Sequence, residues 1–206
     1  MKYYFFVFWL NSLCILLVIT LSIYATFLKL PIGLLFLPPV ASPYPIISIF
    51  THTFQLLCTV PVILCSFSFG LLVSINPRHP ANKFILGSAL LTGGFLVNEI
   101  FRIHIYLLAF AGVPKMNTSA LFGFILLLYG LGFWRQIQST PYLLLITGFG
   151  LLLIAILVDW LHLRGNDIPA LLEGVPKLFS QLNISIYYWL VCQREVKRSL
   201  NSSYYY

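Results

Sequence analysis

Apolar residues form six long stretches along this chain, separated by short segments that contain proline, glycine or charged side chains. A transmembrane helix needs about 20 apolar residues, because it rises about 1.5 Å per residue through a hydrocarbon core about 30 Å thick. Each stretch reaches or approaches this length. We therefore predict six transmembrane helices, at residues 3–28, 45–75, 84–104, 118–134, 141–161 and 169–192.

Two segments between the predicted helices are informative. Residues 29–44 contain four prolines, and proline lacks the amide that an interior helical turn needs. We expect this segment to be an apolar loop at the membrane interface. Residues 105–113 stay apolar, so the third helix either continues past His104 or bends into a segment along the membrane surface. The sequence leaves both alternatives open.

The composition assigns the whole chain to the membrane. Hydrophobic residues make up 60% of its 206 residues and charged residues only 8%, whereas a soluble domain carries about 25% charged residues. So few charges cannot cover the surface of a soluble fold of this size, and most of the exterior must face lipid. We predict an all-α, polytopic membrane protein with a single transmembrane domain over residues 1–206.

The formal net charge of +7 raises the question of a nucleic-acid partner. A groove that follows a nucleic-acid backbone requires basic residues with interleaved aromatic side chains, and the chain has no such run. Its basic residues stand mostly at the ends of the predicted helices. We therefore expect membrane lipid as a partner, no nucleic acid, and membrane-protein partners as an open alternative.

The distribution of lysine and arginine predicts the orientation, because loops rich in these residues stay on the cytoplasmic side. Seven basic residues fall on one side of the predicted membrane and three on the other. The larger set is Lys2, Arg78, Lys83, Arg135, Arg194, Lys197 and Arg198, and the smaller set is Lys29, Lys115 and Arg164. Both termini are therefore predicted to be cytoplasmic.

Ionisable side chains inside the predicted helices are the candidate functional residues. Each costs at least about 2.5 kcal/mol at mid-membrane, and such residues usually face the bundle interior or a water-filled cavity. With the predicted orientation and a rise of about 1.5 Å per residue, all of them fall in the outer third of the membrane. They are His52 in the second helix, Glu99, Arg102 and His104 in the third, Asp159 and His162 at the end of the fifth, and Glu173 and Lys177 in the sixth.

We expect these residues to line one polar chamber at the extracytoplasmic end. Their spacing of three or four residues favours a pair within each helix: Glu99 with Arg102, Asp159 with His162, and Glu173 with Lys177. Two interpretations stay open. The chamber binds a small polar or lipid-headgroup ligand, or the pairs only neutralise charge in a structural or assembly subunit of a larger membrane complex.

A metal-dependent intramembrane hydrolase is a further alternative. Histidine and carboxylate ligands suit zinc, iron or manganese, but the chain has no HExxH, HxxxH or ExxH spacing. A hydrolase also needs an activated nucleophile or a metal-bound water, and no serine stands in a G-x-S-x-G frame. The sequence therefore leaves enzymatic activity open and assigns no cofactor and no metal ligand.

Cysteines and glycines are expected to serve packing. Cys14, Cys58 and Cys65 lie in apolar stretches and Cys192 lies near the last helix end, with no CxxC pair. Cys58 and Cys65 are seven residues apart on one helix, too far to form a disulfide. Glycines in the fourth and fifth helices are expected to allow close helix approach. They are Gly123, Gly130, Gly132, Gly148 and Gly150.

Two short motifs resemble those of an uncharacterised group of multi-pass membrane proteins of bacteria, including cyanobacteria. That group carries acidic-acidic-x-Phe-x-x-His-Glu in one helix, which Glu99, Phe101 and His104 match. It also carries Glu-Glu-Gly-x-Lys near the last helix, which Glu173, Gly174 and, one residue later, Lys177 match. Asp159 is similar to a single aspartate in the preceding helix of that group.

The resemblance covers residues from about 84 to 189. It supports the six-helix fold and the choice of candidate residues, and it implies a bacterial plasma membrane or a thylakoid membrane. Asn98, Ile105 and Leu172 stand where the group has acids. These departures count against catalysis, and because the group has no assigned activity the resemblance implies no reaction.

Overall fold

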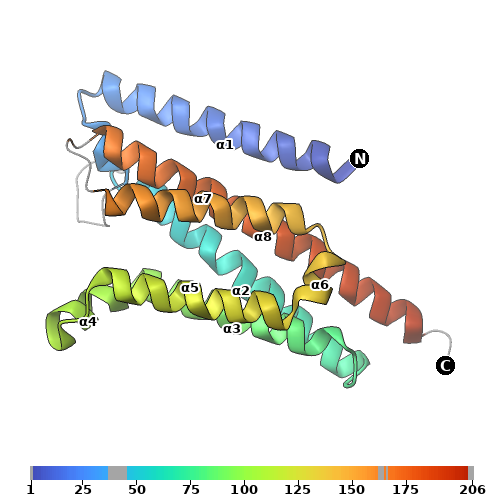
Figure 1. Cartoon of the computed structure of the whole chain (residues 1–206). Helices are drawn as coiled ribbons and strands as arrows, with labels where there is room; N and C mark the ends of the chain where they lie inside the picture. Colours follow the sequence, from blue (N-terminus) through green and yellow to red (C-terminus); the bar gives the residue numbers. More distant parts are fainter. Residues whose placement is uncertain (1, 37–45, 162–164, 166, 204–206) are drawn as a thin grey trace. The chain divides into compact units, whose positions relative to one another are not determined.

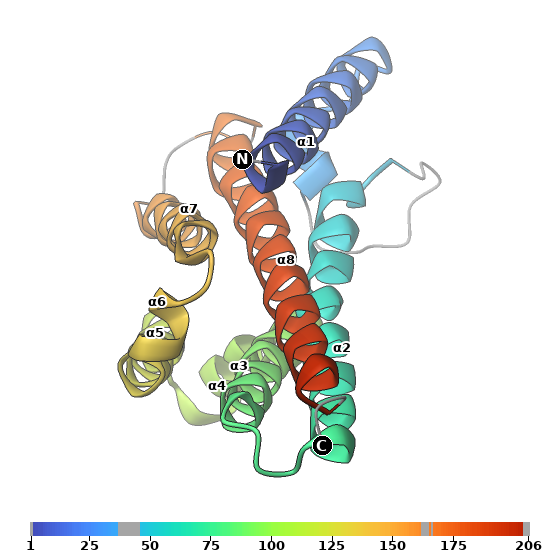
Figure 2. The ribbon, with the colours of Figure 1, turned by 90° about the vertical axis from the view of Figure 1, so that its right-hand side faces the viewer.

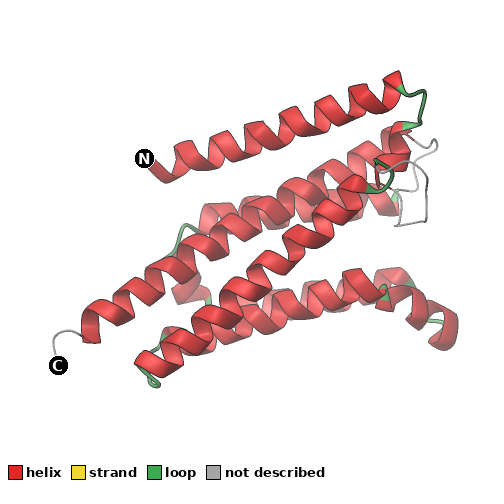
Figure 3. Ribbon diagram, turned by 180° about the vertical axis from the view of Figure 1, so that it is seen from behind, coloured by secondary structure: helices red, strands yellow, loops and turns green. Residues whose placement is uncertain are grey.

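The structure is a computed structural model that describes residues 2–36, 46–161, 165 and 167–203. Their regular secondary structure is helical (Figures 1 and 3), which confirms the predicted all-α class. The elements are α1 (Lys2–Phe27), η1 (Ile32–Phe36), α2 (Ile49–Ile75), α3 (Ala81–Phe101), α4 (Ile103–Ala111), α5 (Lys115–Gly132), α6 (Trp134–Gln138), α7 (Tyr142–Trp160) and α8 (Asp167–Ser203).

Within the described part of the chain, four helices have the length and apolar composition that crossing a membrane requires. They are α1 over Phe5–Phe27, α2, α3 and α7. The apolar part of α5, Met116–Gly132, is shorter. Helix α8 is about 55 Å long, at about 1.5 Å per residue over its 37 residues, and it carries many more polar side chains. The four apolar helices indicate an integral membrane protein.

The chain divides into two compact units. Unit 1 comprises Met1–Leu57 and Leu143–Ile186, and unit 2 comprises Cys58–Tyr142 and Tyr187–Tyr206. Because α2 and α8 are long, each of them contributes its first part to one unit and its second part to the other.

In unit 1, the first part of α8 packs against α1 and α7 (Figure 2). Asn183 of α8 and Asn11 of α1 exchange amide hydrogen bonds of 3.0 and 3.3 Å. Such a reciprocal pair satisfies two amides in an apolar setting. On the other side, Gly148 of α7 lies so close to α8 that an added Cβ would meet the side chain of Ile184 at 2.7 Å.

The carbonyl of Leu57 in α2 provides a further contact in unit 1. Pro61 has no amide to donate to the carbonyl of Leu57, one turn earlier. Two side chains of α8 take the place of this amide: the hydroxyl of Ser185 donates to the Leu57 carbonyl at 3.1 Å, and the amide of Gln181 donates at 3.4 Å. The helix therefore continues through the proline, and the free carbonyl joins α2 to α8.

In unit 2, α3 and α5 form an antiparallel pair. The rings of Phe84 and Phe133 lie 5.5 Å apart, and the hydroxyls of Ser88 and Tyr129 lie 2.6 Å apart. Further along, the rings of Phe95 and Phe122 lie 6.4 Å apart. Each step forward on α3 is matched by an equal step back on α5, so the two helices keep one register over their length.

The third predicted helix ends earlier than expected. Helix α3 stops at Phe101 because Arg102 adopts a left-handed backbone with φ 49°, and α4 begins at the next residue. Gly112, with φ 63°, ends α4. The chain therefore bends after Arg102, so the third helix does not continue straight past His104 (Figure 1). Helix α4 exposes apolar side chains, among them Tyr106 and Phe110.

Several hydroxyl side chains bond back to the carbonyl one turn earlier in their own helix. Such bonds satisfy a hydroxyl where no water is present, as the interior of a bilayer requires. The bonds run from Thr20 to Leu16, Thr26 to Ser22, Thr53 to Ile49, Ser74 to Gly70, Ser88 to Phe84 and Thr92 to Ser88, with lengths of 2.8 or 2.9 Å.

Candidate functional site

The predicted site residues fall into two sets, one in each unit. His52, Asp159, Glu173 and Lys177 belong to unit 1, and Glu99 and Arg102 belong to unit 2. The backbone of His104 lies in α4, but its side chain is outside the described part of the chain, and His162 lies outside it altogether. The predicted pairs Glu99–Arg102 and Asp159–His162 therefore stay predictions.

The ion pair predicted within the last helix is confirmed in unit 1. The ammonium of Lys177 lies 2.5 Å from a carboxylate oxygen of Glu173, and both side chains are partly buried. Asp159 is also partly buried near the end of α7. His52 is exposed and stands off the face of α2 that buries Phe50 and Phe54. Glu173 and Lys177 are thus joined directly, and Glu99 and Asp159 each have an interaction of their own within the protein.

Unit 1 has one acidic contact that the sequence analysis missed. The amide of Gly33, in η1, donates a 2.8 Å hydrogen bond to a carboxylate oxygen of Asp167. Asp167 opens α8, where a carboxylate is also stabilised by the helix dipole. The ring of Phe36 packs against Gly174 and lies 4.8 Å from the ring of Phe50. The sequence did contain a signal for this position, because Asp167 stands two residues before Pro169, a pattern typical of a helix start.

The polar end of unit 2, which we define by Asn98, Glu99, Arg102 and Thr118, has unsatisfied acceptors. Asn98 is 7% exposed and Thr118 is 6% exposed. Within the described ranges, neither Asn98 Oδ1 nor Thr118 Oγ1 has a hydrogen-bond partner. Thr92 shows the alternative, a hydroxyl that bonds back to the carbonyl of Ser88, whereas Thr118, like Ser22 and Ser180, has no partner within the described residues.

The register of α3 and α5 places these two acceptors at the same level. Asn98 follows Phe95 by three residues and Thr118 precedes Phe122 by four, so both continue the faces on which the two rings meet. Glu99 is the next residue of α3 and is partly buried. Arg102 follows within one turn, where α3 ends. Glu99 and Arg102 were predicted as site residues from their charge, whereas the uncharged Asn98 and Thr118 were not.

This arrangement suits a small ligand that carries both donors and a negative charge. The amide oxygen, the hydroxyl and the carboxylate accept hydrogen bonds from an ammonium or a hydroxyl. A guanidinium such as that of Arg102 has the donor geometry that matches a phosphate or carboxylate. No group of three or more histidine, cysteine, aspartate or glutamate side chains that could hold a metal occurs among the described residues.

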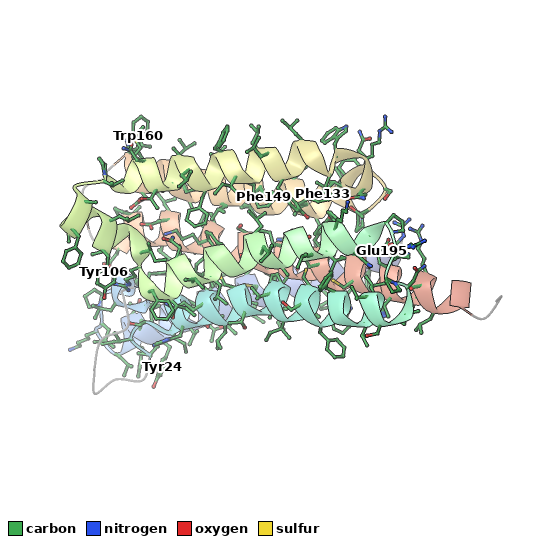
Figure 4. The ribbon with its side chains drawn as sticks, turned by 90° about the horizontal axis from the view of Figure 1, so that it is seen from below. Tyr24, Tyr106, Phe133, Phe149, Trp160 and Glu195 are labelled. Carbon is green, nitrogen blue, oxygen red and sulfur yellow. The ribbon has the colours of Figure 1, made fainter. Side chains whose placement is uncertain are left out.

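The other end of unit 2 collects basic side chains, and we call it the basic end. In Figure 4, Tyr106 of α4 lies toward one end of unit 2, while Phe133 and Glu195 lie toward the opposite one. The basic end is formed by the turn between α2 and α3, by α6 and by the last turns of α8. Its residues are Arg78, Lys83, Arg135, Arg194, Lys197 and Arg198.

The core of unit 2 also brings together two cysteines that the sequence analysis did not pair. The sulfurs of Cys65 in α2 and Cys192 in α8 lie 3.9 Å apart, and both side chains are buried. Nearby in α8, Tyr187 and Tyr188 are fully buried, and the Tyr187 hydroxyl lies 3.0 Å from that of Thr140. These contacts are consistent with the predicted packing role of the cysteines.

The comparisons with known proteins identify a family. Neither the curated proteins nor the solved structures gave a match. Among protein families, residues 7–192 match the one described as a domain of unknown function (DUF8692). This match spans most of the chain and includes all the candidate residues, whereas the bacterial group and its two motifs stay predictions. The chain belongs to the DUF8692 family.

Proposed function

We propose that this protein crosses the membrane six times and binds a small polar or lipid-headgroup ligand at its extracytoplasmic end. The six crossings are α1, α2, α3, α5, α7 and α8. Helix α5 supports this number because its apolar part of 17 residues is within the range of about 17–25 that spans a bilayer. The polar side chains of α8 do not argue against a crossing, because Gln181, Asn183 and Ser185 are buried and hydrogen-bonded within unit 1.

The orientation rests on the charge of the two ends of unit 2. The basic end carries six basic side chains, whereas Arg102 is the basic residue of the polar end among the described side chains, and Lys115 follows it in the chain at the start of α5. Basic loops are retained in the cytoplasm, so we place the basic end there and the polar end outside. Both chain termini are then cytoplasmic, and the membrane is a bacterial plasma membrane or a thylakoid membrane.

The observation that carries the proposed binding function is the pair of buried acceptors at Asn98 and Thr118. A buried acceptor without a donor costs roughly 1–3 kcal/mol. Two of them at one level of one helix interface therefore favour a donor supplied from outside the chain. A ligand ammonium or hydroxyl would supply it, and Glu99 beside them would add attraction for a positive charge.

The ligand class follows from the charges at this end. A phosphoethanolamine headgroup carries an ammonium with three donors and a phosphate. We assign the ammonium to Asn98, Thr118 and Glu99, and the phosphate to Arg102. Glu99 has an interaction within the protein already, so the ligand would share this carboxylate with that partner.

One observation favours the second candidate function, a structural or assembly subunit of a larger membrane complex. The Glu173–Lys177 pair is closed in unit 1, as expected if these charges only neutralise each other. A structural subunit would show no stabilisation by a headgroup ligand, which separates it from the binding function. For the binding function, we also retain His52, Asp159 and His162 as proposed ligand-binding residues.

A matched pair of substitutions tests the binding function. Thr118→Val removes an unpartnered hydroxyl of α5, and Thr92→Val removes a hydroxyl of α3 that is satisfied by its own helix. The purified protein in detergent is titrated with phosphatidylethanolamine while its thermal unfolding is followed. We expect the lipid to stabilise the natural protein, and we expect Thr118→Val to weaken its apparent affinity by about tenfold, from the loss of one hydrogen bond to a charged group.

Thr92→Val is expected to retain the affinity for phosphatidylethanolamine. An equal loss in both variants would show that the hydroxyls matter only for packing. If phosphatidylethanolamine does not stabilise the natural protein, the proposed binding function is wrong and the structural function is favoured.

A further inference from the structure

The turn between α2 and α3, at the basic end of unit 2, combines positive charge with the start of a long helix. Arg78 lies in this turn and Lys83 in the first turn of α3. The amide of Gln136, in α6, lies 3.5 Å from the carbonyl of Pro80, which places α6 and its Arg135 beside the turn. Three basic residues therefore surround the N-terminus of α3, where the helix dipole is positive.

The basic residues of this end differ in what they do for the protein. The guanidinium of Arg194 donates to the carbonyl of Ser139, and Arg198 lies 3.2 Å from the carboxylate of Glu195. By contrast, Arg78, Lys83 and Arg135 are exposed, and their side chains make no ion pair or hydrogen bond with any residue that the structure describes. Their charges are therefore available to a partner.

Two buried acceptors lie next to these charges. Asn82, the second residue of α3, is 7% exposed and donates to the carbonyls of Asn76 and Pro77. Its own Oδ1 has no donor within the described residues, and neither has Oε1 of Gln136. The site thus offers positive charge for an anion and acceptors for neighbouring hydroxyls, a combination that a helix N-terminus alone does not provide.

The position of the turn between α2 and α3 indicates which class of anion would bind. The turn joins two candidate membrane spans, since α2 ends at Ile75 and α3 begins at Ala81. Arg78 and Lys83 therefore lie at the depth where lipid phosphates lie, and both flanking helices expose apolar side chains to acyl chains. An anionic lipid of the adjacent leaflet is at high local concentration there, unlike any soluble anion.

We propose that Arg78, Lys83, Arg135 and the N-terminus of α3 form a headgroup site for an anionic phospholipid. The three cations bind the phosphate, and the hydroxyls of a glycerol headgroup donate to Asn82 and Gln136. The N-terminus of α3 contributes its positive dipole end rather than its first two amides, because the amides of Ala81 and Asn82 donate to His79. This site is at the opposite end of unit 2 from Asn98 and Thr118, and it does not depend on the proposed function of that end.

The experiment compares phosphatidylglycerol with phosphatidylcholine as titrants of the purified protein in detergent, with thermal unfolding as the readout. The test variant is Arg78→Gln with Arg135→Gln, and the control is Lys29→Gln with Lys115→Gln, which lowers the net charge by the same amount elsewhere. A basic residue at a membrane surface contributes about 1 kcal/mol toward anionic lipid, so the test variant is expected to bind phosphatidylglycerol about thirtyfold more weakly.

The control variant is expected to keep most of the preference for phosphatidylglycerol. In the natural protein, 0.5 M salt is expected to reduce this preference, because the electrostatic screening length is then only about 4 Å. An equal loss in the test and control variants would show that net charge alone sets the preference and would overturn the site. Equal stabilisation of the natural protein by both lipids would also overturn it. The unfolding temperature in phosphatidylcholine checks that the test variant is folded.

Discussion

Replacing Tyr188 with alanine is expected to lower the free energy of unfolding by about 2–4 kcal/mol. Tyr188 is 1% exposed, and its ring packs edge-on against that of Tyr187 at 5.0 Å. Inside a bilayer, lipid tails are as apolar as a protein core, so the loss comes from missing van der Waals contacts and from the cavity left behind. Denaturation of the purified protein with increasing sodium dodecyl sulfate measures this loss.

The neighbouring residue supplies the control. Trp189 is 52% exposed, and its side chain points away from the core of unit 2 that Tyr188 fills. We expect Trp189→Ala to change the stability by less than about 1 kcal/mol, because the position leaves no buried cavity. Equal losses at both positions would contradict the packing of α8 described here.

The second large effect is expected at Gly148 in α7. A Cβ at this position would lie 2.7 Å from Cγ1 of Ile184 and 3.1 Å from the backbone carbonyl of Ser180, so α7 and α8 would have to separate. Gly148→Ala should therefore destabilise the protein by about 1–3 kcal/mol. Thermal unfolding in detergent provides the measurement.

Gly150, also in α7, provides the control, because the same substitution there does not meet α8. Apart from its chain neighbours and the nearby backbone of α7 itself, no atom of the described residues lies within 4 Å of a Cβ added there. Alanine is a better helix former than glycine by about 0.8–1.0 kcal/mol, so Gly150→Ala should leave the stability unchanged or raise it. A loss at Gly150 as large as that at Gly148 would mean that helix propensity, not close approach of α8, controls the result.

The sequence predicted the helices well but not the faces by which they pack. Hydropathy located α1, α2, α3, α5, α7 and α8 to within a few residues at most ends, because long apolar runs are a strong signal. A membrane helix is apolar on all sides, so its pattern does not reveal which side is buried. Close approach was therefore predicted equally for Gly148 and Gly150, and it is correct only for Gly148.

Two boundaries differed for identifiable reasons. The end of α3 was misplaced because a non-glycine residue, Arg102, adopts the left-handed backbone that ends the helix, and no pattern in its neighbours indicates this. Helix α8 was predicted to end at Cys192 but continues to Ser203. The last part of α8 is too polar to be recognised as a transmembrane segment, although its residues form a helix readily.

The candidate site could be predicted only in part. Charged residues stand out in an apolar chain, so Glu173 and Lys177 were identified together with their pairing. Asn98 and Thr118 are uncharged, and their importance depends on having no partner, which only the packing of α3 against α5 reveals. Long-range contacts such as Asn11 with Asn183, or Cys65 with Cys192, leave no local signal in the sequence.

The central claim is that the polar end of unit 2 faces away from the cytoplasm, which in a plasma membrane is the outside of the cell, and that the basic end faces the cytoplasm. Single cysteines placed at Lys115 and at Lys197, with the four native cysteines replaced by alanine, test it in intact cells with a membrane-impermeant maleimide. We expect labelling at position 115 without lysis and at position 197 only after lysis. Labelling of position 197 in intact cells, with position 115 protected, would contradict the orientation and the outward-facing ligand site.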